Sequence, residues 1–204
     1  MVERQLRHRD ITDPRVLEAM GRVPRELFVP EELRARAYDD AALPIGVGQT
    51  ISQPYMVAAI CQELGLRGSE RVLDVGTGSG YQAAVLAELA AEVVTIERIP
   101  ELAHAAREHL AAAGYGRVEV HVGDGSVGLP ERAPFDAIAV AAAAPDFPQL
   151  LYDRLRQGGR LVVPVGDRRG QRLLLIVRSP EGPAVIRSVP CRFVPLVGEE
   201  GFAG

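Results

Sequence analysis

The stretch Asp74-Val75-Gly76-Thr77-Gly78-Ser79-Gly80 decides the fold of this chain. It ends an apolar, strand-like segment, Arg71–Val75, and leads into an apolar, helix-like segment, Ser79–Ala90. A strand that turns through three closely spaced glycines into a helix leaves its backbone accessible, because glycine has no Cβ to block a ligand. The stretch therefore predicts a turn that binds a nucleotide-type cofactor.

Strand-like and helix-like segments alternate from residue 71 onwards. The strand-like segments are Arg71–Val75, Glu92–Ile96, Arg117–Val122, Phe135–Val140 and Arg160–Val165. The helix-like segments between them are Ser79–Ala90, Pro100–Ala113 and Asp146–Arg156, and two further strands, Arg172–Arg178 and Ala184–Phe193, come after them. This alternation predicts an α/β fold with a doubly wound, mostly parallel sheet that helices cover on both faces.

The first 65 residues carry a different pattern. Asp13-Pro14 reads as a helix start, Glu31–Ala37 as a short helix, and Pro54 as the start of a third helix. Between them, Leu43–Ser52 is rich in glycine and predicted to be irregular. We therefore predict one domain over residues 1–204, in which a helical extension (1–65) precedes a cofactor-binding core (66–204).

Composition narrows the functional classes. A chain of 204 residues with 47% hydrophobic side chains can bury one sizeable core, and a formal net charge of −4 argues against a nucleic-acid binder. The longest apolar run, Ala137–Ala144, is far shorter than the roughly 20 residues that a membrane helix needs. The N-terminus is charged where a signal peptide would be apolar, so a cytoplasmic protein is expected. The oligomeric state stays open, with a monomer as the working expectation.

Neither the cysteines nor the histidines are spaced for metal binding. Cys61 and Cys191 form no CxxC motif and lie in apolar surroundings, which is typical of buried free thiols. The four histidines include no HxxxH or HExxH pair. We therefore predict no metal site.

The spacing of the glycines indicates which cofactor the turn binds. Dinucleotide sites for hydride transfer favour GxGxxG, whereas Gly76, Gly78 and Gly80 give GxGxG with the bulky Tyr81 next. This geometry suits a cofactor without a diphosphate. The preceding Asp74 could meet a cationic amino group, which also argues against an anionic ligand.

Two acidic residues come directly after the next predicted strands. Glu97 ends the second strand, 21 positions after Gly76, where its carboxylate could accept hydrogen bonds from a ribose diol. Asp124-Gly125 comes after the third strand, where an acceptor beside an open backbone could hold an adenine amino group. Parallel α/β sheets bind ligands at these strand ends. Each residue alone could be structural, but the ordered set resembles the class I S-adenosylmethionine-dependent methyltransferases, which have a Rossmann-like fold.

The resemblance extends over nearly the whole chain to one family, the protein-L-isoaspartate O-methyltransferases. The most diagnostic segment is Gln49–Pro54, which has no reason to recur in unrelated methyltransferases. The other matching segments are Val23–Pro30, Ala37–Asp40, Leu43–Gly48, Gly76–Ala87, Thr95–Arg98, Ala133–Asp136, Leu161–Gly166 and Arg192–Leu196.

This resemblance implies methyl transfer from S-adenosylmethionine to the free carboxylate of L-isoaspartyl residues in damaged proteins and peptides, with S-adenosylhomocysteine as product. The methyl ester would then close to a succinimide and hydrolyse partly to normal aspartate. Ser52 is implied as the catalytic residue, although its position also permits it to cap the helix that begins at Pro54. We expect Gln53, Pro54 and Val163–Gly166 to shape a narrow substrate cleft. The implied cofactor-binding residues are Ile51, Gln53, Pro54, Asp74, Gly76, Thr77, Gly78, Ser79, Gly80, Glu97, Arg98, Asp124 and Gly125.

Three alternatives are compatible with parts of the sequence. A methyltransferase with another acceptor would keep the glycine turn, but it would not explain why the chain carries the family segment Gln49–Pro54. A non-enzymatic module on the same scaffold is possible in principle, since a fold does not fix a function. An NAD-dependent oxidoreductase is disfavoured by the GxGxG spacing.

Overall fold

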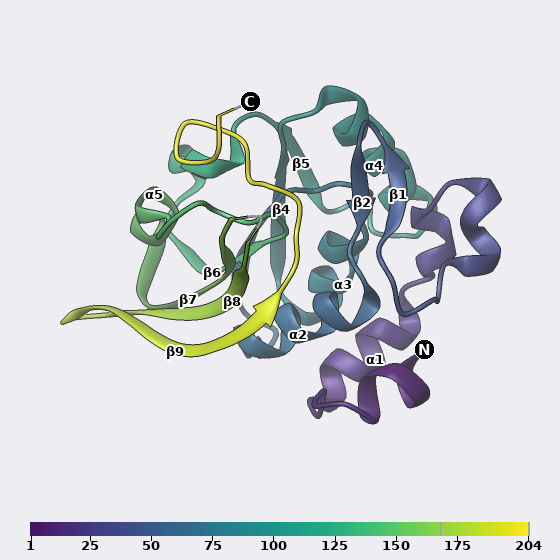
Figure 1. Ribbon diagram of the computed structural model, residues 1–204, viewed down its shortest axis with the longest axis horizontal. Helices are drawn as coiled ribbons and strands as arrows, with labels where there is room; N and C mark the ends of the chain where they lie inside the picture. Colours follow the sequence, from purple (N-terminus) through teal and green to yellow (C-terminus); the bar gives the residue numbers. More distant parts are fainter. Residues whose placement is uncertain (168, 204) are drawn as a thin grey trace.

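A seven-stranded sheet with the order β5-β4-β3-β6-β7-β8-β9 forms the centre of the molecule (Figure 1). We describe it from a computed structural model that covers residues 1–167 and 169–203, so Arg168 and Gly204 of the predicted core domain lie outside the described residues. The strands are β3 (Arg71–Val75), β4 (Glu92–Glu97), β5 (Glu119–Val122), β6 (Phe135–Val140), β7 (Leu155–Gly166), β8 (Gln171–Ser179) and β9 (Gly182–Cys191).

The direction of the strands creates a crevice beside β3. Strands β5, β4, β3, β6 and β7 are parallel, and β8 and β9 are antiparallel to their neighbours. The chain winds from β3 outward to β4 and β5 and then returns to place β6 on the other side of β3. Such a switch point is where open α/β sheets bind ligands. The predicted doubly wound, mostly parallel fold is confirmed.

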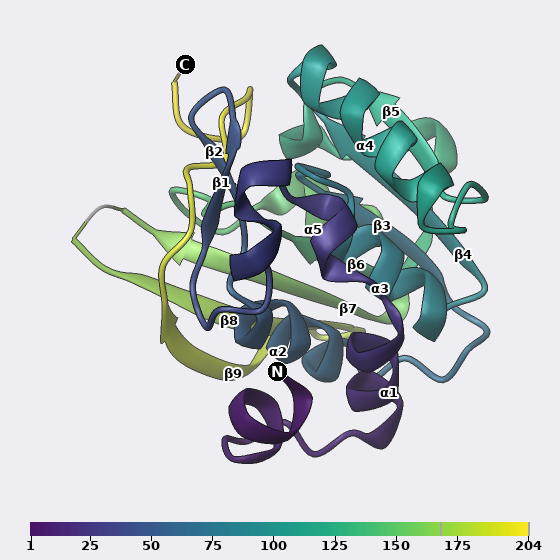
Figure 2. The ribbon, with the colours of Figure 1, turned by 90° about the vertical axis from the view of Figure 1, so that its right-hand side faces the viewer.

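Helices cover both faces of this sheet. They are α1 (Pro14–Arg22), α2 (Pro54–Leu64), α3 (Tyr81–Leu89), α4 (Pro100–Ala112) and α5 (Gln149–Asp153). Figure 2 views the face covered by α2, α3 and α4, while α5 and the short 3₁₀ helices 125–127 and 130–132 lie on the opposite face. Alternate residues of one strand point to opposite faces of the sheet. Val72 packs in the hydrophobic cluster that includes α2 and α3, and Leu73 packs in the cluster that includes α5.

Two segments differ from their predictions. The residues expected to be irregular form an antiparallel hairpin, β1 (Leu43–Gly46) and β2 (Gln49–Ile51), because Gly46, Val47 and Gly48 all take positive φ and reverse the chain. The helix expected over residues 146–156 is shorter in the structure and consists of α5 alone. Pro148 is the N-cap residue at its start, and Leu155 already belongs to β7.

The N-terminal elements pack into the same core as the sheet. Leu6, from the short π-helix Val2–Arg7, and Met20, from α1, are buried in a cluster that also contains Val72 of β3 and Val162 of β7. Helix α1 begins as predicted, with the Asp13 carboxylate accepting a hydrogen bond from the backbone N–H of Arg15.

Both cysteines are free, but only one is fully buried. Cys61 lies in α2 against the core, as predicted, whereas Cys191 is half-buried because it ends the edge strand β9. Within residues 1–167 and 169–203, no helix combines the length and hydropathy of a membrane span.

Candidate active site

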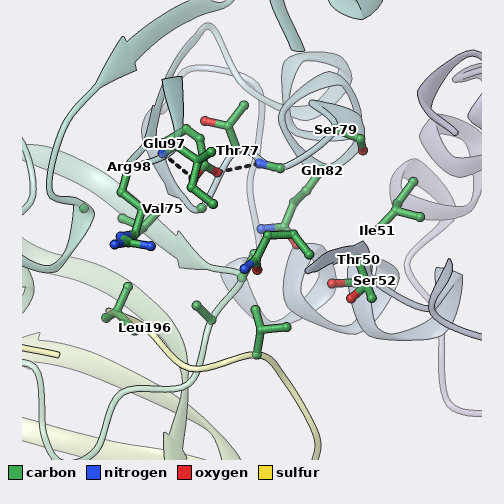
Figure 3. A pocket seen from close by; sticks show the side chains of 18 of the residues that line it. Thr50, Ile51, Ser52, Val75, Thr77, Ser79, Gln82, Glu97, Arg98 and Leu196 are labelled. Carbon is green, nitrogen blue, oxygen red and sulfur yellow. Dashed lines mark hydrogen bonds between the residues drawn. The ribbon is translucent and has the colours of Figure 1, made fainter. Parts of the chain in front are cut away.

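A cavity lies at the carboxyl ends of β3, β4 and β6 (Figure 3). The turns after these strands form its base, and the β1–β2 hairpin and the C-terminal segment after β9 form its sides. This is the strand edge that the sequence predicts. The predicted site residues that line the cavity are Ile51, Ser52, Gly76, Thr77, Gly78, Ser79, Glu97, Arg98 and Gly125.

The glycine turn has the backbone geometry that its sequence requires. Gly76, Gly78 and Gly80 take φ values of +90°, +54° and +92°, which residues with a side chain rarely adopt. The turn is anchored at its start, where the Gly76 N–H donates to the Ile96 carbonyl oxygen at 2.9 Å. Gly80 faces Leu110 of α4 rather than the cavity, so its role is to let the start of α3 pack closely against α4.

Glu97 is held rigidly at the edge of the cavity. One carboxylate oxygen accepts the Gly78 N–H at 2.9 Å and the other accepts the Ile99 N–H at 3.1 Å (Figure 3). Each carboxylate oxygen retains a free lone pair for a second donor. The carboxylate therefore fits a ribose diol and needs no rearrangement to receive it.

Asp74 lies behind the glycine turn and does not line the cavity. Its side chain is fully buried and accepts hydrogen bonds from Gln82 Nε2 and Thr95 Oγ1, both at 2.8 Å. Burial raises the pKa of this carboxyl to about 6, so it is mostly ionised at neutral pH. Gln82 does line the cavity, and its amide oxygen is buried with no partner among the described residues. A cationic amino group would thus meet Gln82, with the Asp74 charge behind it.

Asp124 has a different setting from the one predicted. Its carboxylate accepts the N–H groups of Ser126 and Glu199, at 2.8 and 2.7 Å, and so holds the C-terminal segment in place. Only the neighbouring Gly125 lines the cavity, where an added Cβ would lie 2.7 Å from Val75. Pro54 and Gly80 also lie outside the cavity lining.

A second hollow opens beside the first. It is lined by Ala42, Thr50, Ser52, Gln53, Met56, Ala141, Arg192, Phe193 and Val194. Four residues line both spaces, namely Thr50, Ser52, Ala141 and Val194. Gln53, predicted to contact both the cofactor and the substrate, lines this hollow and not the first cavity. Val163–Gly166 lines neither space because those residues pair with β8 inside the sheet.

Ser52 stands at the junction of the two spaces. Its hydroxyl makes no hydrogen bond to the described residues, and the N-cap of α2 is Gln53, without a side-chain cap bond. The alternative that Ser52 caps this helix is therefore wrong. Its carbonyl oxygen accepts a hydrogen bond from Arg25 at 2.7 Å, which fixes the backbone that carries the free hydroxyl.

Sequence reasoning missed part of the lining. Ala141 and Ala142 directly follow β6, so the rule that ligands bind at strand ends would have found them. Tyr81 and Gln82 belong to the first turn of α3, immediately after the glycines. The segment 194–197 overlaps the family motif Arg192–Leu196, but no local pattern predicts that a C-terminal segment returns to this site.

The residues present fit S-adenosylmethionine. Glu97 is fixed for the ribose, the unpartnered Gln82 oxygen and the buried Asp74 charge suit an amino group, and Gly125 adds a residue without a side chain to the lining. No diphosphate-sized set of free backbone N–H groups is left at the turn, because the Gly76, Gly78 and Gly80 N–H groups are already bonded.

Comparisons with known proteins find relatives over nearly the whole chain. The chain matches a sequence model described as protein-L-isoaspartate(D-aspartate) O-methyltransferase over residues 1–201. It is 58% identical over 204 residues to protein-L-isoaspartate O-methyltransferase 2 of Marinobacter nauticus, covering 99% of this chain and 93% of the relative. It is 55% identical to the enzyme named protein-L-isoaspartate O-methyltransferase from Methanoculleus marisnigri, covering 100% and 93%.

A solved structure shares the fold over almost its full length. It is a Plasmodium falciparum protein described as a putative protein-L-isoaspartate O-methyltransferase in complex with S-adenosyl-L-homocysteine, and the TM-score is 0.82 at 27% identity, with 96% of each chain covered. The family match over residues 1–201 and the curated relatives at 55% and 58% identity show that this chain belongs to the protein-L-isoaspartate(D-aspartate) O-methyltransferase family.

Proposed function

We propose that the cavity at the glycine turn binds S-adenosylmethionine and that the hollow beside it receives the free carboxylate of an L-isoaspartyl residue, with Ser52 between them. The observation that carries this assignment is the position of Ser52, which lines both spaces and has a hydroxyl without a partner among the described residues. S-adenosylmethionine supplies an electrophilic methyl group on a sulfonium sulfur. The reaction is that of the family, and the roles of the individual residues are the proposal.

The donor side of the site is rigid and negatively charged. Glu97 is fixed by two backbone N–H groups, and the Asp74 carboxylate lies behind the turn. These two charges favour a cation in the cavity, and Arg98 at its margin is the basic side chain in the lining. We assign Glu97 to the ribose, Gln82 to the amino group, and Gly76–Ser79 to close backbone contact.

The acceptor side needs positioning rather than a base. A carboxylate with a reference pKa of about 4 is already ionised at neutral pH, so no group has to remove a proton. The Ser52 hydroxyl can donate a hydrogen bond to one carboxylate oxygen and leave the other oxygen to attack the methyl carbon. The amino end of α2, beside Gln53 and Met56, adds the positive end of a helix dipole.

Two segments can exclude water from the reacting groups. The β1–β2 hairpin and the C-terminal segment contribute Thr50 and Val194, which line both spaces. Stripping water from the carboxylate strengthens its interactions with the few donors that remain. The ester that forms would close on the following backbone nitrogen to a succinimide, with methanol leaving, and this step needs no residue of the enzyme.

Methylation of an isoaspartyl peptide tests the proposal directly. Incubation with methyl-labelled donor should give base-labile label in the isoaspartyl peptide and none in the matched aspartyl peptide. Equal labelling of both peptides would favour a methyltransferase with another acceptor, and no labelling of either would contradict the proposed acceptor.

The finer biological assignments form part of the same proposal. Damaged proteins with isoaspartyl sites are the proposed partners, and residues 1–65 and 66–204 are proposed to act as one domain because they share a core. The two free thiols favour a reducing compartment, so we propose that the enzyme works in the cytoplasm.

A further inference from the structure

Arg25 is a fully buried arginine directly behind the proposed acceptor site. Its side chain is 0% exposed. Nε donates to the Ala37 carbonyl oxygen and Nη2 to the Ser52 carbonyl oxygen, both at 2.7 Å. Nη1 has no hydrogen-bond partner among the described residues, and the guanidinium lies 4.6 Å from the centre of the Tyr81 ring.

No carboxylate neutralises this buried charge. Arg25 forms no ion pair within the described part of the chain, although many other arginines do. The titratable groups that act on it electrostatically are the phenols of Tyr81 and Tyr38, and burial lowers the pKa of its guanidinium. A buried ion without a counter-ion is destabilising, so its retention calls for a reason outside stability.

The position of the guanidinium supplies that reason. Ser52, whose carbonyl it holds, lines both spaces of the proposed active site, and Tyr81, whose ring it faces, lines the cavity at the glycine turn. Helix α2 begins two residues after Ser52, so its positive end faces the same region. A positive charge and a helix amino end thus lie together behind a wall whose acceptor side, among the described residues, includes the basic Arg192 and no acidic residue.

We propose that Arg25 is a positioning residue that makes the acceptor site selective for an ionised carboxylate. It fixes the Ser52 peptide through one Nη, and its uncompensated charge attracts the negative acceptor without touching it. An acidic partner would cancel that attraction. The inference rests on the proposed binding of the acceptor carboxylate beside Ser52.

A pair of peptides that differ only in acceptor charge tests this role. One carries isoaspartate, and the other carries isoasparagine, whose carboxamide is neutral and nearly the same size. For the wild-type enzyme we expect the KM of the isoaspartyl peptide to lie at least about tenfold below the inhibition constant of the isoasparaginyl peptide. In Arg25→Met the isoaspartyl KM should rise about tenfold, while the isoasparaginyl inhibition constant should change less than about twofold. Arg25→Lys, which keeps the charge, should keep most of the discrimination.

Arg15 offers a matched control. Its guanidinium also bridges two carbonyl oxygens, those of Leu66 and Leu89, but neither residue lines the active site. Arg15→Met should therefore lower thermal stability without changing the ratio of the two peptide affinities. The affinity for S-adenosylhomocysteine, measured by calorimetry, should stay the same in the Arg25 variants.

Several outcomes would overturn the inference, and they differ from failure of the proposed function. If Arg25→Met weakens the binding of both peptides equally, Arg25 has only a structural role. Equal affinity of both peptides for the wild-type enzyme would exclude charge selection even if no Arg25 variant folds. By contrast, a wild-type enzyme that does not methylate the isoaspartyl peptide would refute the proposed function itself.

Discussion

In the proposed mechanism, Ser52 acts on catalysis without any acid–base chemistry. The acceptor carboxylate is already ionised, so the proposed contribution of the hydroxyl is a single hydrogen bond that orients it. A hydrogen bond to a charged group contributes about 1.5–3 kcal/mol. This sets the scale for what the loss of Ser52 can do.

Ser52→Ala should lower kcat for an isoaspartyl peptide by about 10- to 100-fold and leave the affinity for S-adenosylhomocysteine nearly unchanged. The hydroxyl has no hydrogen bond to the described residues, so its removal should not destabilise the fold. Steady-state kinetics and calorimetry measure the two effects. Ser69→Ala, in an exposed turn far from the site, is the control. A parallel loss of donor affinity in Ser52→Ala would contradict the separation of roles.

The second prediction at this scale concerns Asp74 and the pH dependence of the unfolding free energy. Burial raises its pKa from 3.8 to about 6, so the folded protein holds this proton more tightly than the unfolded chain. The stability that this group contributes is therefore present below pH 4 and is lost as the pH rises to about 6. The wild type should lose about 3 kcal/mol of unfolding free energy, relative to Asp74→Asn, over this range.

Chemical denaturation of both proteins between pH 4 and pH 8 checks this expectation. The difference between the two unfolding free energies should change between pH 4 and about pH 6 and become constant at higher pH. A difference that is independent of pH would mean that Asp74 titrates normally. Asp136→Asn is a control, because that carboxylate lies at the opposite end of the sheet.

At the scale of single elements, the glycine turn has the geometry on which donor binding depends. Gly78 takes a positive φ, and a Cβ at this position would lie 3.4 Å from Ile45 of the β1–β2 hairpin. The hairpin and the turn therefore approach each other over the cavity. A branched side chain here would strain the turn and push the hairpin away.

Gly78→Val should abolish measurable binding of S-adenosylhomocysteine by calorimetry while the protein stays folded. Gly114→Val is a matched control, since Gly114 also has a positive φ, of +87°, but no described atom lies within 4 Å of its would-be Cβ. The control should lose stability and keep the affinity. If both variants bind the ligand equally well, the turn does not contact it.

The elements also show what the sequence can predict. Strands β3 and β6 match their expected bounds because apolar runs between turn residues define a buried parallel strand. The hairpin β1–β2 escaped detection because Val47, a β-branched residue, takes a positive φ that its type disfavours. The contact between Asp124 and the Glu199 N–H was not predicted, because Glu199 is 75 positions away and no local pattern reveals it.

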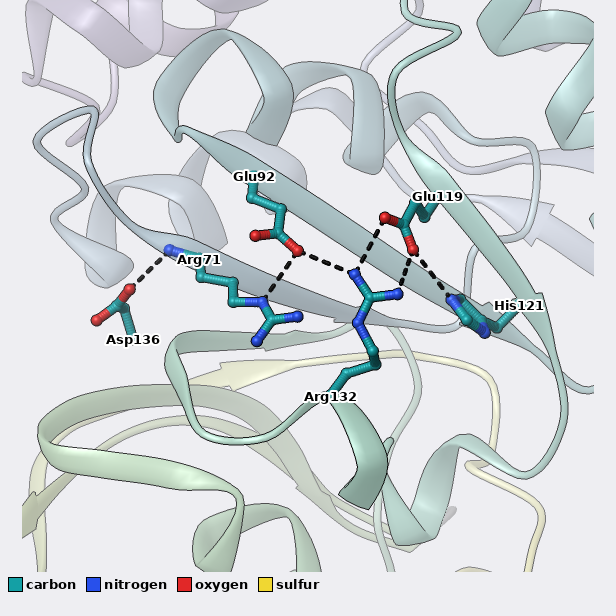
Figure 4. Close-up of polar contacts among 6 residues, drawn as sticks. All are labelled: Arg71, Glu92, Glu119, His121, Arg132 and Asp136. Atoms are coloured by element: carbon teal, nitrogen blue, oxygen red, sulfur yellow. Dashed lines mark hydrogen bonds and ion pairs between the residues drawn. The ribbon is translucent and has the colours of Figure 1, made fainter.

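At the scale of the whole molecule, chemistry and charge pairing lie at opposite ends of the sheet. The active site occupies the carboxyl ends of the strands, while the amino ends carry a chain of ion pairs (Figure 4). Arg132 lies between two glutamates. It donates a hydrogen bond to Glu92 of β4 at 3.1 Å and two hydrogen bonds to Glu119 of β5. Arg71 of β3 and His121 of β5 extend the chain on either side.

This separation predicts that the ion pairs can be broken without an effect on catalysis. Arg132→Met should lower the melting temperature at low salt, because Glu92 and Glu119 lose the cation between them. The deficit should shrink at about 1 M salt, where the Debye length is only about 3 Å. The KM values for donor and peptide should not change. Arg34→Met, which removes an exposed arginine that forms no ion pair in the described part of the chain, should alter neither quantity. A change in peptide KM for Arg132→Met would mean that the two ends of the sheet are coupled, and the rigid strands between them would then transmit strain to Ser52 and Glu97.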